Sequence, residues 1–364
     1  MSVDDGVSGQ PVPDPATIRA VVELAARAPS LHNTQPWRWR FDGRRLSLFA
    51  DAARQLSSTD PLGRQLVISC GAMLHHVRTG FADRGWRTDI TRVPDQRHPD
   101  RLAAIEFRPW HNPPPSIRSL ARAIEHRRTD RLALRAPHGW GELLPRLRAL
   151  TAAQYARLDV LDESVRPELT ALSREFATLR GHDLFYDTEL HWWTGHSEDH
   201  QGIPRSALAS DAEFARVGVG RVFPPGPRTA HRDHLTDRAR LVVLSAVRDS
   251  VPQWLRIGEA LSAVLLECTA ADLATCALTN ITELPAGRDL LTGLISSPGI
   301  PQVVVRIGTV PADNTYTPPP TPRRPVAEIL TLAGGKVAGP PHTATDPDRR
   351  GGVGTGSRGQ RSAR

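Results

Sequence analysis

The chain has 364 residues, of which 39% are hydrophobic and 5% aromatic, and this supports a sizeable core. Its formal net charge of +7 includes +4 from residues 335–364, where one Lys and five Arg face two Asp, so the remainder carries only +3. A remainder this close to neutrality argues against specific nucleic-acid binding, and no apolar run approaches the roughly 20 residues that span a bilayer.

The two ends of the chain differ from its middle. Residues 1–13 lack the basic start and the apolar segment of a secretory signal, so we expect a flexible N-terminus and a cytoplasmic protein. Residues 335–364 are mostly Gly, Pro, Thr and Arg without apolar periodicity, which predicts a disordered basic tail. Cys70, Cys268 and Cys276 have no C-x-x-C spacing and are expected to be inert, buried thiols.

The first predicted elements are a helix and a hairpin. The helix starts at Pro15, because Asp14 can cap it and proline is favoured at the first helical position. Apolar residues then recur at helical spacing for three turns. After a loop, residues 37–41 and 46–48 run on either side of Asp42-Gly43 with alternating apolar side chains, which predicts a hairpin.

The other regular elements are predicted from apolar periodicity and from proline and glycine positions. In chain order we expect a buried helix at 66–81, strands at 86–91 and 102–107, a stiff linker at 111–115, a helix capped by Ser116, a strand at 158–161, a helix at 164–179, a buried strand at 241–247, a long helix at 254–277 and a buried strand at 302–308. One outline of capped helix, strands and long helix therefore occurs on each side of the linker.

Residues 186–235 interrupt this outline, because they contain Gly, Pro, His and Trp with little periodicity. A segment of this length without regular structure is usually a lid, a binding loop or disorder, and we expect a lid-like insertion. The histidines in and near it match no zinc-ligand spacing, so no metal site is predicted; they are His182, His191, His196 and His200.

The loop at residues 28–37 reads A-P-S-L-H-N-T-Q-P-W. Pro29 and Pro36 fix two φ angles and cannot donate from their own nitrogens, so the side chains of Ser30, Asn33 and Gln35 are displayed in one conformation. Such a loop suits a flat ligand with a polar edge. The alternative is a plain connection in which Asn33 and Gln35 hydrogen-bond their own backbone.

The longer string R-A-P-S-L-H-N-T-Q-P-W-R-W, from Arg27 to Trp39, resembles the flavin-contacting segment of the nitroreductase family, in the form typical of its Acg-type single-chain branch. The resemblance implies an α+β, nitroreductase-like fold with two related halves, residues 14–112 and 113–334, that form an internal pseudo-dimer around one FMN. It also implies that the cofactor is contacted by Pro29, Ser30, Leu31, Asn33 and Gln35.

A second motif, Arg127-x-Thr129-x-Arg131, presents two guanidinium groups and a hydroxyl at a spacing of two residues, which suits a phosphate monoester. A solvated basic surface is the alternative. The motif resembles the R-x-S-x-K/R phosphate grip of nitroreductases. Arg323 and Arg324 are similar to a basic pair near the C-terminus that completes the phosphate site in that family.

The distribution of these motifs predicts one site per chain. The proline-braced loop occurs only in the front half and the basic motif only in the rear half, and no R-x-[ST]-x-[KR] string precedes Pro29. The two halves would therefore pair as two subunits do in ordinary nitroreductases.

The turn at residues 284–287 is a third candidate segment. The resemblance suggests that this turn donates a backbone N–H to flavin N5, with Ala286 and Gly287 as candidates, although a simple loop accounts for the sequence of these residues equally well.

By the chemistry of the family, FMN would take hydride from NAD(P)H and pass electrons to an unidentified small-molecule acceptor, with no catalytic acid or base from the protein. The alternative is an FMN-sequestering protein whose lid blocks turnover. A third possibility is nucleic-acid binding through the basic tail. We expect a monomer, or a weak homodimer, because one chain supplies both halves.

Overall fold

The computed structural model describes residues 11–194, 201–227, 232, 234–312 and 320–333. Most of the predicted flexible N-terminus and all of the predicted basic tail lie outside these ranges. Among the described residues, no helix is both long enough and apolar enough to cross a membrane.

The first half forms the elements that its sequence predicts. Its helices and strands are α1 (Pro15–Ala25), β1 (Trp37–Phe41), β2 (Leu46–Ala50), α2 (Arg64–Asp83), β3 (Trp86–Arg92) and β4 (Arg101–Pro109). The Asp14 side chain accepts from the backbone N–H of Thr17 at 2.7 Å and so caps α1. In β1 the buried Trp37, Trp39 and Phe41 alternate with exposed arginines, because one face of the strand packs on the core.

The second half contains more elements than expected. They are α3 (Pro115–His126), α4 (Trp140–Ala152), β5 (Ala156–Val160), α5 (Arg166–Gly181), α6 (Leu184–Trp193), α7 (Asp211–Val217), β6 (Arg240–Ala246), α8 (Val251–Ala270), β7 (Ala274–Leu278), α9 (Pro285–Leu294), β8 (Ile300–Gly308), α10 (Val326–Ile329) and β9 (Leu330–Leu332). The predicted boundary at residues 112–113 falls between β4 and α3.

The two sheets follow one plan. The first has the strand order β3-β4-β2-β1-β9, and the second, read from its far edge, has the order β7-β8-β6-β5. Strands β1 to β4 thus correspond to β5 to β8, all neighbours among them pair antiparallel, and a long helix follows the second strand of each half. The fold is α+β with two related halves, as the sequence predicts. The extra strand β9 returns from the C-terminal segment and pairs in parallel with β1.

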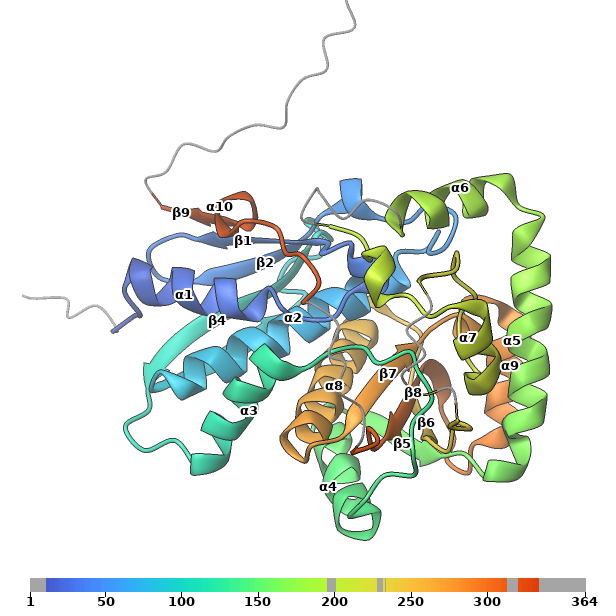
Figure 1. The fold of residues 1–364 in the computed structure, drawn as a ribbon. Helices are drawn as coiled ribbons and strands as arrows, with labels where there is room; N and C mark the ends of the chain where they lie inside the picture. The colour runs from blue at the N-terminus through green and yellow to red at the C-terminus, as the bar shows by residue number, and fades with distance from the viewer. Residues whose placement is uncertain (1–10, 195–200, 228–231, 233, 313–319, 334–364) are drawn as a thin grey trace, which may run out of the picture. The chain divides into compact units, whose positions relative to one another are not determined.

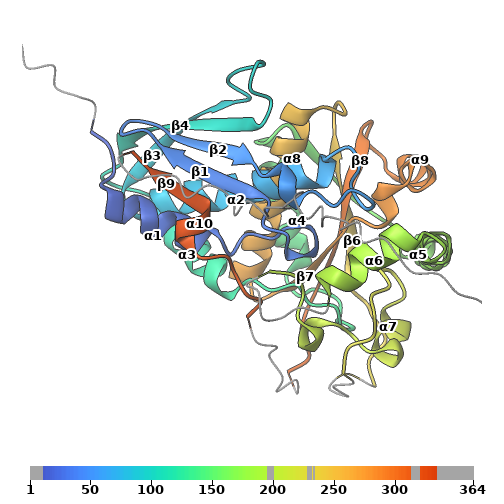
Figure 2. The same cartoon turned by 90° about the horizontal axis from the view of Figure 1, so that it is seen from above.

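The long helices α2 and α8 pack against each other in the middle of the molecule (Figures 1 and 2). Their closest approach is at Gly71 and Gly258, where an added Cβ would lie 2.1 Å from the carbonyl oxygen of Leu255 and 2.0 Å from that of Ile68, respectively. Only glycine fits at such a distance. The small residues of both helices therefore serve to join the two halves.

Outside residues 186–235, the structure departs from the predicted local structure at three points. The long helix ends at Ala270 and not at Ala277, because the chain turns at Asp272 with φ +56° and continues as β7. Helix α4 was not predicted, since Pro145 lies inside it. Ser116 does not cap α3, which begins one residue earlier at Pro115 without a side-chain cap.

Residues 161–239, which connect β5 to β6, are called the insertion below; of these, 195–200, 228–231 and 233 are not described. The prediction of little regular structure at 186–235 is wrong for the described part, because α6 is capped by Asp183 and α7 begins with a capping box formed by Ser210 and Glu213. Figure 2 shows α5, α6 and α7 beyond the second sheet, on the side opposite α1.

Candidate functional site

A cavity opens where the two halves meet, and it is called the central cavity below. It is lined by the loop after α1, the first turns of α2, the segment after α3, the end of β7, the insertion and the C-terminal segment. The predicted site residues that line it are Pro29, Ser30, Leu31, Asn33, Arg127, Thr129, Arg131 and Arg323. The proline-braced loop and the basic motif, which are about a hundred residues apart in sequence, therefore border one cavity.

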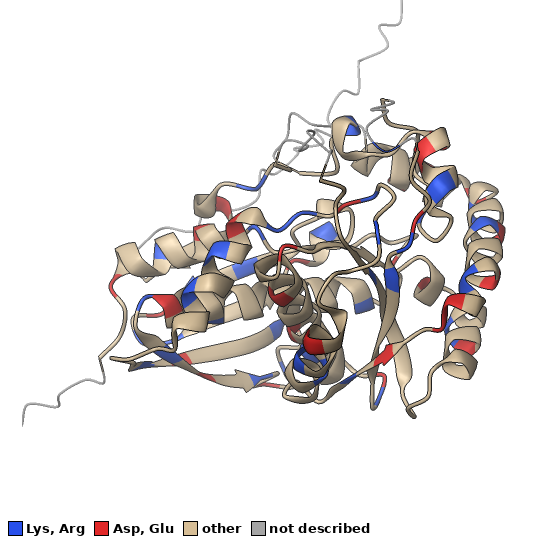
Figure 3. Ribbon diagram, turned by 60° about the horizontal axis from the view of Figure 1, so that its bottom comes forward, with Lys and Arg blue, Asp and Glu red and all other residues tan. Residues whose placement is uncertain are grey.

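Arg27, Arg127 and Arg323 form an arginine cluster at the cavity wall. Arg127 Nη2 and Arg323 Nη2 both donate to the carbonyl oxygen of Arg27 at 3.2 Å, and Arg323 Nε donates to that of Ala26 at 2.8 Å. Within the described ranges no ion pair joins any of the three to a carboxylate. Figure 3 shows basic segments, in blue, along loops in the middle of the fold.

The pKa values of the cluster reflect this crowding. Burial, then Arg27 and Arg128, lowers the pKa of Arg127 to about 10, and burial, then Arg127 and Arg27, lowers the pKa of Arg323 to about 9. Both groups remain protonated near neutral pH, so the cluster holds several positive charges with little water around them. An anion in the cavity would relieve this repulsion.

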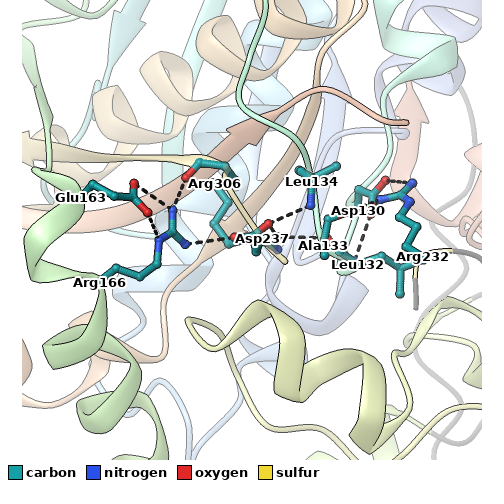
Figure 4. Close-up of polar contacts among 10 residues, drawn as sticks. Asp130, Leu132, Ala133, Leu134, Glu163, Arg166, Arg232, Asp237 and Arg306 are labelled. Carbon is teal, nitrogen blue, oxygen red and sulfur yellow. Dashed lines mark hydrogen bonds and ion pairs between the residues drawn. The ribbon is translucent and has the colours of Figure 1, made fainter. Parts of the chain in front are cut away.

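A separate network holds the residues next to Arg131 and Thr129, and Figure 4 shows its members Asp130, Leu132, Arg232 and Arg306. The Asp130 carboxylate pairs with Arg232 at 3.0 and 2.9 Å, and the carbonyl oxygen of Leu132 accepts from Arg306 at 3.0 Å. Thr129 forms a parallel bridge with Thr275 at the start of β7. These contacts fix both sides of Arg131, whose guanidinium donates to the insertion at Ala207 and lies 5.3 Å from the ring centroid of Phe223.

The loop after α1 has an unusual backbone, since His32, Asn33 and Gln35 have φ angles of +48°, +58° and +51°. Non-glycine residues rarely adopt this region, and here hydrogen bonds hold them in it. The Ser30 hydroxyl accepts a hydrogen bond from the backbone N–H of Gln35 at 3.0 Å. The backbone carbonyl oxygen of Ser30 accepts one from the backbone N–H of Asn33 at 3.1 Å. Pro29 and Pro36 flank the bend, as the sequence predicts.

Comparison with known proteins identifies the family. No family model matches the chain. The "Putative NAD(P)H nitroreductase acg" of Mycobacterium tuberculosis is 45% identical over 314 residues, which cover 86% of this chain and 95% of that protein. A second "Putative NAD(P)H nitroreductase" of that organism is 37% identical over 324 residues, covering 87% of this chain and 92% of the relative.

The chain belongs to the Acg-type nitroreductase family. Among solved structures, a putative nitroreductase from Anabaena variabilis matches with a TM-score of 0.44 and 8% identity over 83% of this chain and 90% of that chain. The FMN-dependent nitroreductase NfnB from Mycobacterium smegmatis, solved in complex with NADPH, matches with a TM-score of 0.32 and 14% identity over 56% of this chain and 93% of that chain.

The structure places two motif residues of this Acg-type protein differently from the sequence prediction. The Asn33 amide donates to the carbonyl oxygens of Gly202, at 2.8 Å, and Pro322, at 3.0 Å. The Gln35 side chain is fully buried outside the cavity lining, accepts from the backbone N–H of Arg324 at 2.8 Å and donates to the Asn33 carbonyl at 3.3 Å. Both amides thus hold the loop to other segments, although Asn33 also lines the cavity.

Besides Gln35, three predicted residues do not line the central cavity, namely Arg324, Ala286 and Gly287. Arg324 pairs with Asp51 at 3.6 Å and with Glu328 at 3.4 Å. Ala286 and Gly287 are in the first turn of α9 and not in a free turn, because Pro285 occupies the first helical position, where proline is favoured. Gly287 packs there against the backbone of Ile281, since an added Cβ would lie 2.0 Å from its carbonyl oxygen.

The insertion crosses the cavity and contacts the first half. Besides the Asn33 bond to Gly202, the Glu189 carboxylate accepts from the backbone N–H groups of Ser58 and Thr59 at 3.1 and 3.0 Å and from the Thr59 hydroxyl at 2.6 Å. The rings of Phe223 and His32 meet edge to face, with ring centroids 5.7 Å apart. Sequence patterns gave no sign of Phe223 as a cavity residue, since it comes from an aperiodic stretch.

The described residues include no cluster of three or more His, Cys, Asp or Glu side chains that could hold a metal ion. His196 and His200 lie outside the described ranges. All three cysteines are free and buried, as predicted, and Cys276 lines the cavity. Burial raises the pKa of Cys268 to about 12, so its thiol stays protonated.

Proposed function

We propose that this protein is an FMN-binding oxidoreductase that uses NAD(P)H. The observation that carries the proposal is the arginine cluster, which borders a cavity built from both halves and has no carboxylate partner in the described part of the chain. Burying several guanidinium groups without counter-charge is costly, and a phosphate supplies the missing charge with matching geometry. The name of the 45% identical relative, a putative NAD(P)H nitroreductase, supports NAD(P)H as the electron donor.

The residues of the site divide by their roles. Arg127 and Arg323 would bind the phosphate, and Thr129 and Arg131 would complete its ligands from the rear half. Pro29, Ser30 and Leu31 would form the wall along the ring and the ribityl chain. Asn33, Gln35 and Arg324 position this wall through their contacts with the insertion and with each other. Ala286 and Gly287 are left out of the proposed set.

When bound, FMN supplies a ring that accepts hydride from NAD(P)H and gives the electrons to a second small molecule. The protein needs no acid or base for the hydride step, so no catalytic residue is proposed. Its contribution is to fix the ring between the halves and to limit water through the insertion. One chain supplies both walls of the cavity, and for this reason we expect a monomer or weak homodimer. We also expect the protein to be cytoplasmic.

Flavin titrations of the apoprotein test this proposal. Quenching of flavin fluorescence should show that FMN binds at least about tenfold more tightly than riboflavin, because a charge-assisted phosphate contact is worth roughly 1.5–3 kcal/mol. The purified protein should show the visible absorption of an oxidised flavin. Equal affinity for the two flavins, or no binding of either, would contradict the proposed site.

A second candidate function is storage of FMN without turnover. The insertion favours it, because Phe223 contacts His32 and Arg131 and the insertion is bonded to the first half at Asn33, Ser58 and Thr59. Mixing the flavin-loaded protein with NADPH without oxygen separates the two functions. Rapid loss of the yellow colour supports the oxidoreductase, and persistent oxidised flavin supports storage.

A further inference from the structure

Besides Arg27 and Arg127 of the arginine cluster, three polar side chains of the central cavity have atoms without hydrogen-bond partners among the described residues. They are His32, which is 4% exposed, Gln65, which is 2% exposed, and Asn280, which is 8% exposed. Both ring nitrogens of His32, Nε2 of Gln65 and Oδ1 of Asn280 are unpartnered. Buried polar groups in folded proteins are almost always bonded, so three such groups around one cavity point to a ligand that bonds them.

The three residues come from three segments that the fold ties together. Gln65 is in the first turn of α2, and its neighbour Arg64 donates to the Thr282 carbonyl at 2.5 Å, two residues beyond Asn280. The loop that carries His32 is fixed to α2, because the backbone N–H of Leu31 donates to the Ser69 hydroxyl at 3.2 Å and that hydroxyl donates to the Gln65 carbonyl at 2.7 Å.

The arginines that act on His32 differ from those that act on Arg127 and Arg323. Arg221 and Arg131 act on His32, and of these Arg131 is also a proposed phosphate ligand, whereas the charges acting on Arg127 and Arg323 come from within the arginine cluster and its neighbour Arg128. Burial, then Arg221 and Arg131, lowers the pKa of His32 well below its ordinary value, so its imidazole is neutral. A neutral imidazole offers one donor and one acceptor.

The unpartnered atoms differ in hydrogen-bonding type. The Asn280 amide nitrogen donates to the Gly220 carbonyl at 3.1 Å, which leaves Oδ1 as an unpartnered acceptor on a residue that lines the cavity, while Nε2 of Gln65 is a donor. An anion would leave Asn280 Oδ1 without a donor. A heterocycle with a ring N–H between two carbonyl groups would bond both kinds of atom, and the apolar side chains of Ile68 and Leu261 line the same cavity.

We propose that His32, Gln65 and Asn280 bind the polar edge of the isoalloxazine ring, in place of Asn33 and Gln35. This inference rests on the proposed function, since it assumes a bound flavin. Asn33 and Gln35 are positioning residues, because their amides are bonded to Gly202, Pro322 and Arg324. The polar edge and the phosphate are thus bound by different residues.

The test compares flavins that share the ring but not the phosphate. Apoprotein variants Gln65→Met and His32→Phe keep side-chain volume and remove the polar atoms, and each is titrated with FMN, riboflavin and lumiflavin by fluorescence quenching. We expect each variant to lower the affinity for all three flavins by the same factor of about ten, as loss of a buried hydrogen bond does. Arg127→Ala, the matched variant at the phosphate, should lower the affinity for FMN alone.

Stability of the apoprotein separates ligand binding from a structural role. Because the removed atoms have no protein partner, Gln65→Met and His32→Phe should leave the Tm of the apoprotein unchanged or raise it while flavin affinity falls. Normal flavin affinity in both variants, or loss confined to FMN, would overturn this inference and leave the proposed function intact. If the wild-type protein binds none of the three flavins, the proposed function itself fails.

Discussion

The two halves share a strand plan but differ in the segment between the first helix and the first strand. Between α1 and β1, residues 26–36 include the loop with three positive φ angles, and this loop lines the central cavity. At the corresponding place between α4 and β5, residues 153–155 form a short turn that does not line it. The rear half instead contributes Arg127 to Arg131 ahead of α4. Each half therefore supplies a different part of the lining of the central cavity.

Pairing of the halves is most vulnerable at Gly258. A Cβ there would lie 2.0 Å from the Ile68 carbonyl oxygen, and this backbone atom cannot move without separating α2 from α8. We expect Gly258→Leu to lower the free energy of unfolding by about 3 kcal/mol or more, measured by chemical denaturation. The control is Gly141→Ala in α4, where no atom lies within 4 Å of the added Cβ and the change should be neutral or stabilising. Equal effects at the two glycines would mean that the helices are not held this closely.

The two long helices also differ at their N-terminal ends. The Asp60 carboxylate accepts from the backbone N–H of Leu66 at 2.8 Å in α2, whereas Ser250 at the start of α8 makes no side-chain cap bond. Burial raises the pKa of Asp60 from 3.8 to about 6, so the folded state binds this proton more tightly than the unfolded state. Protonated Asp60 therefore stabilises the folded state fully at pH values below the pKa that Asp60 has in the unfolded chain. This stabilisation is lost as the pH rises through 6, the pKa in the folded state.

We expect the free energy of unfolding to fall by at most about 3 kcal/mol through this group between about pH 4 and pH 7. Asp60→Asn keeps an acceptor for the cap and removes the titration. Denaturation of both proteins across this range gives the contribution as their difference. A difference that stays constant with pH would show that Asp60 titrates normally.

The sequence predicted most of the framework and the two motifs because both depend on local patterns. Capping at Asp14, alternation in β1 and the apolar β6 are read directly from neighbouring residues. Contacts between distant segments are not local in this sense, and for that reason the bonds of Asn33 to Gly202 and of Gln35 to Arg324 could not be read from the sequence. Gln65 and Asn280 belong to no recognisable motif, and only the fold brings them to one cavity. The end of α8 was missed since its apolar pattern continues into β7 without a glycine or proline.

Arg323 and Arg324 offer a comparison of adjacent residues with different surroundings. Arg323 lines the cavity within the arginine cluster, and Arg324 pairs with Asp51 and Glu328. We expect Arg323→Ala to weaken FMN binding by roughly 1.5–3 kcal/mol without changing riboflavin binding. Arg324→Ala should instead lower stability by about 1 kcal/mol or less and affect both flavins alike. Flavin titrations and Tm measurements on the two variants decide this, and indistinguishable variants would remove Arg323 from the phosphate site.

The two halves also differ in the connection between their first two strands. In the first half β1 and β2 are joined by a tight turn at Asp42–Arg45, and in the second half β5 and β6 are joined by the insertion, where we expect the smallest effect of a substitution. Glu189 fixes the insertion to Ser58 and Thr59 through three bonds, and it is half-buried. Glu189→Ala should lower overall stability by about 1 kcal/mol but speed FMN dissociation several-fold, because local opening of the insertion becomes easier. Glu175→Ala, at an exposed position of α5 in the same insertion, is the control. If FMN leaves both variants at the wild-type rate, the contact at Glu189 does not govern access, and neither storage nor turnover depends on it.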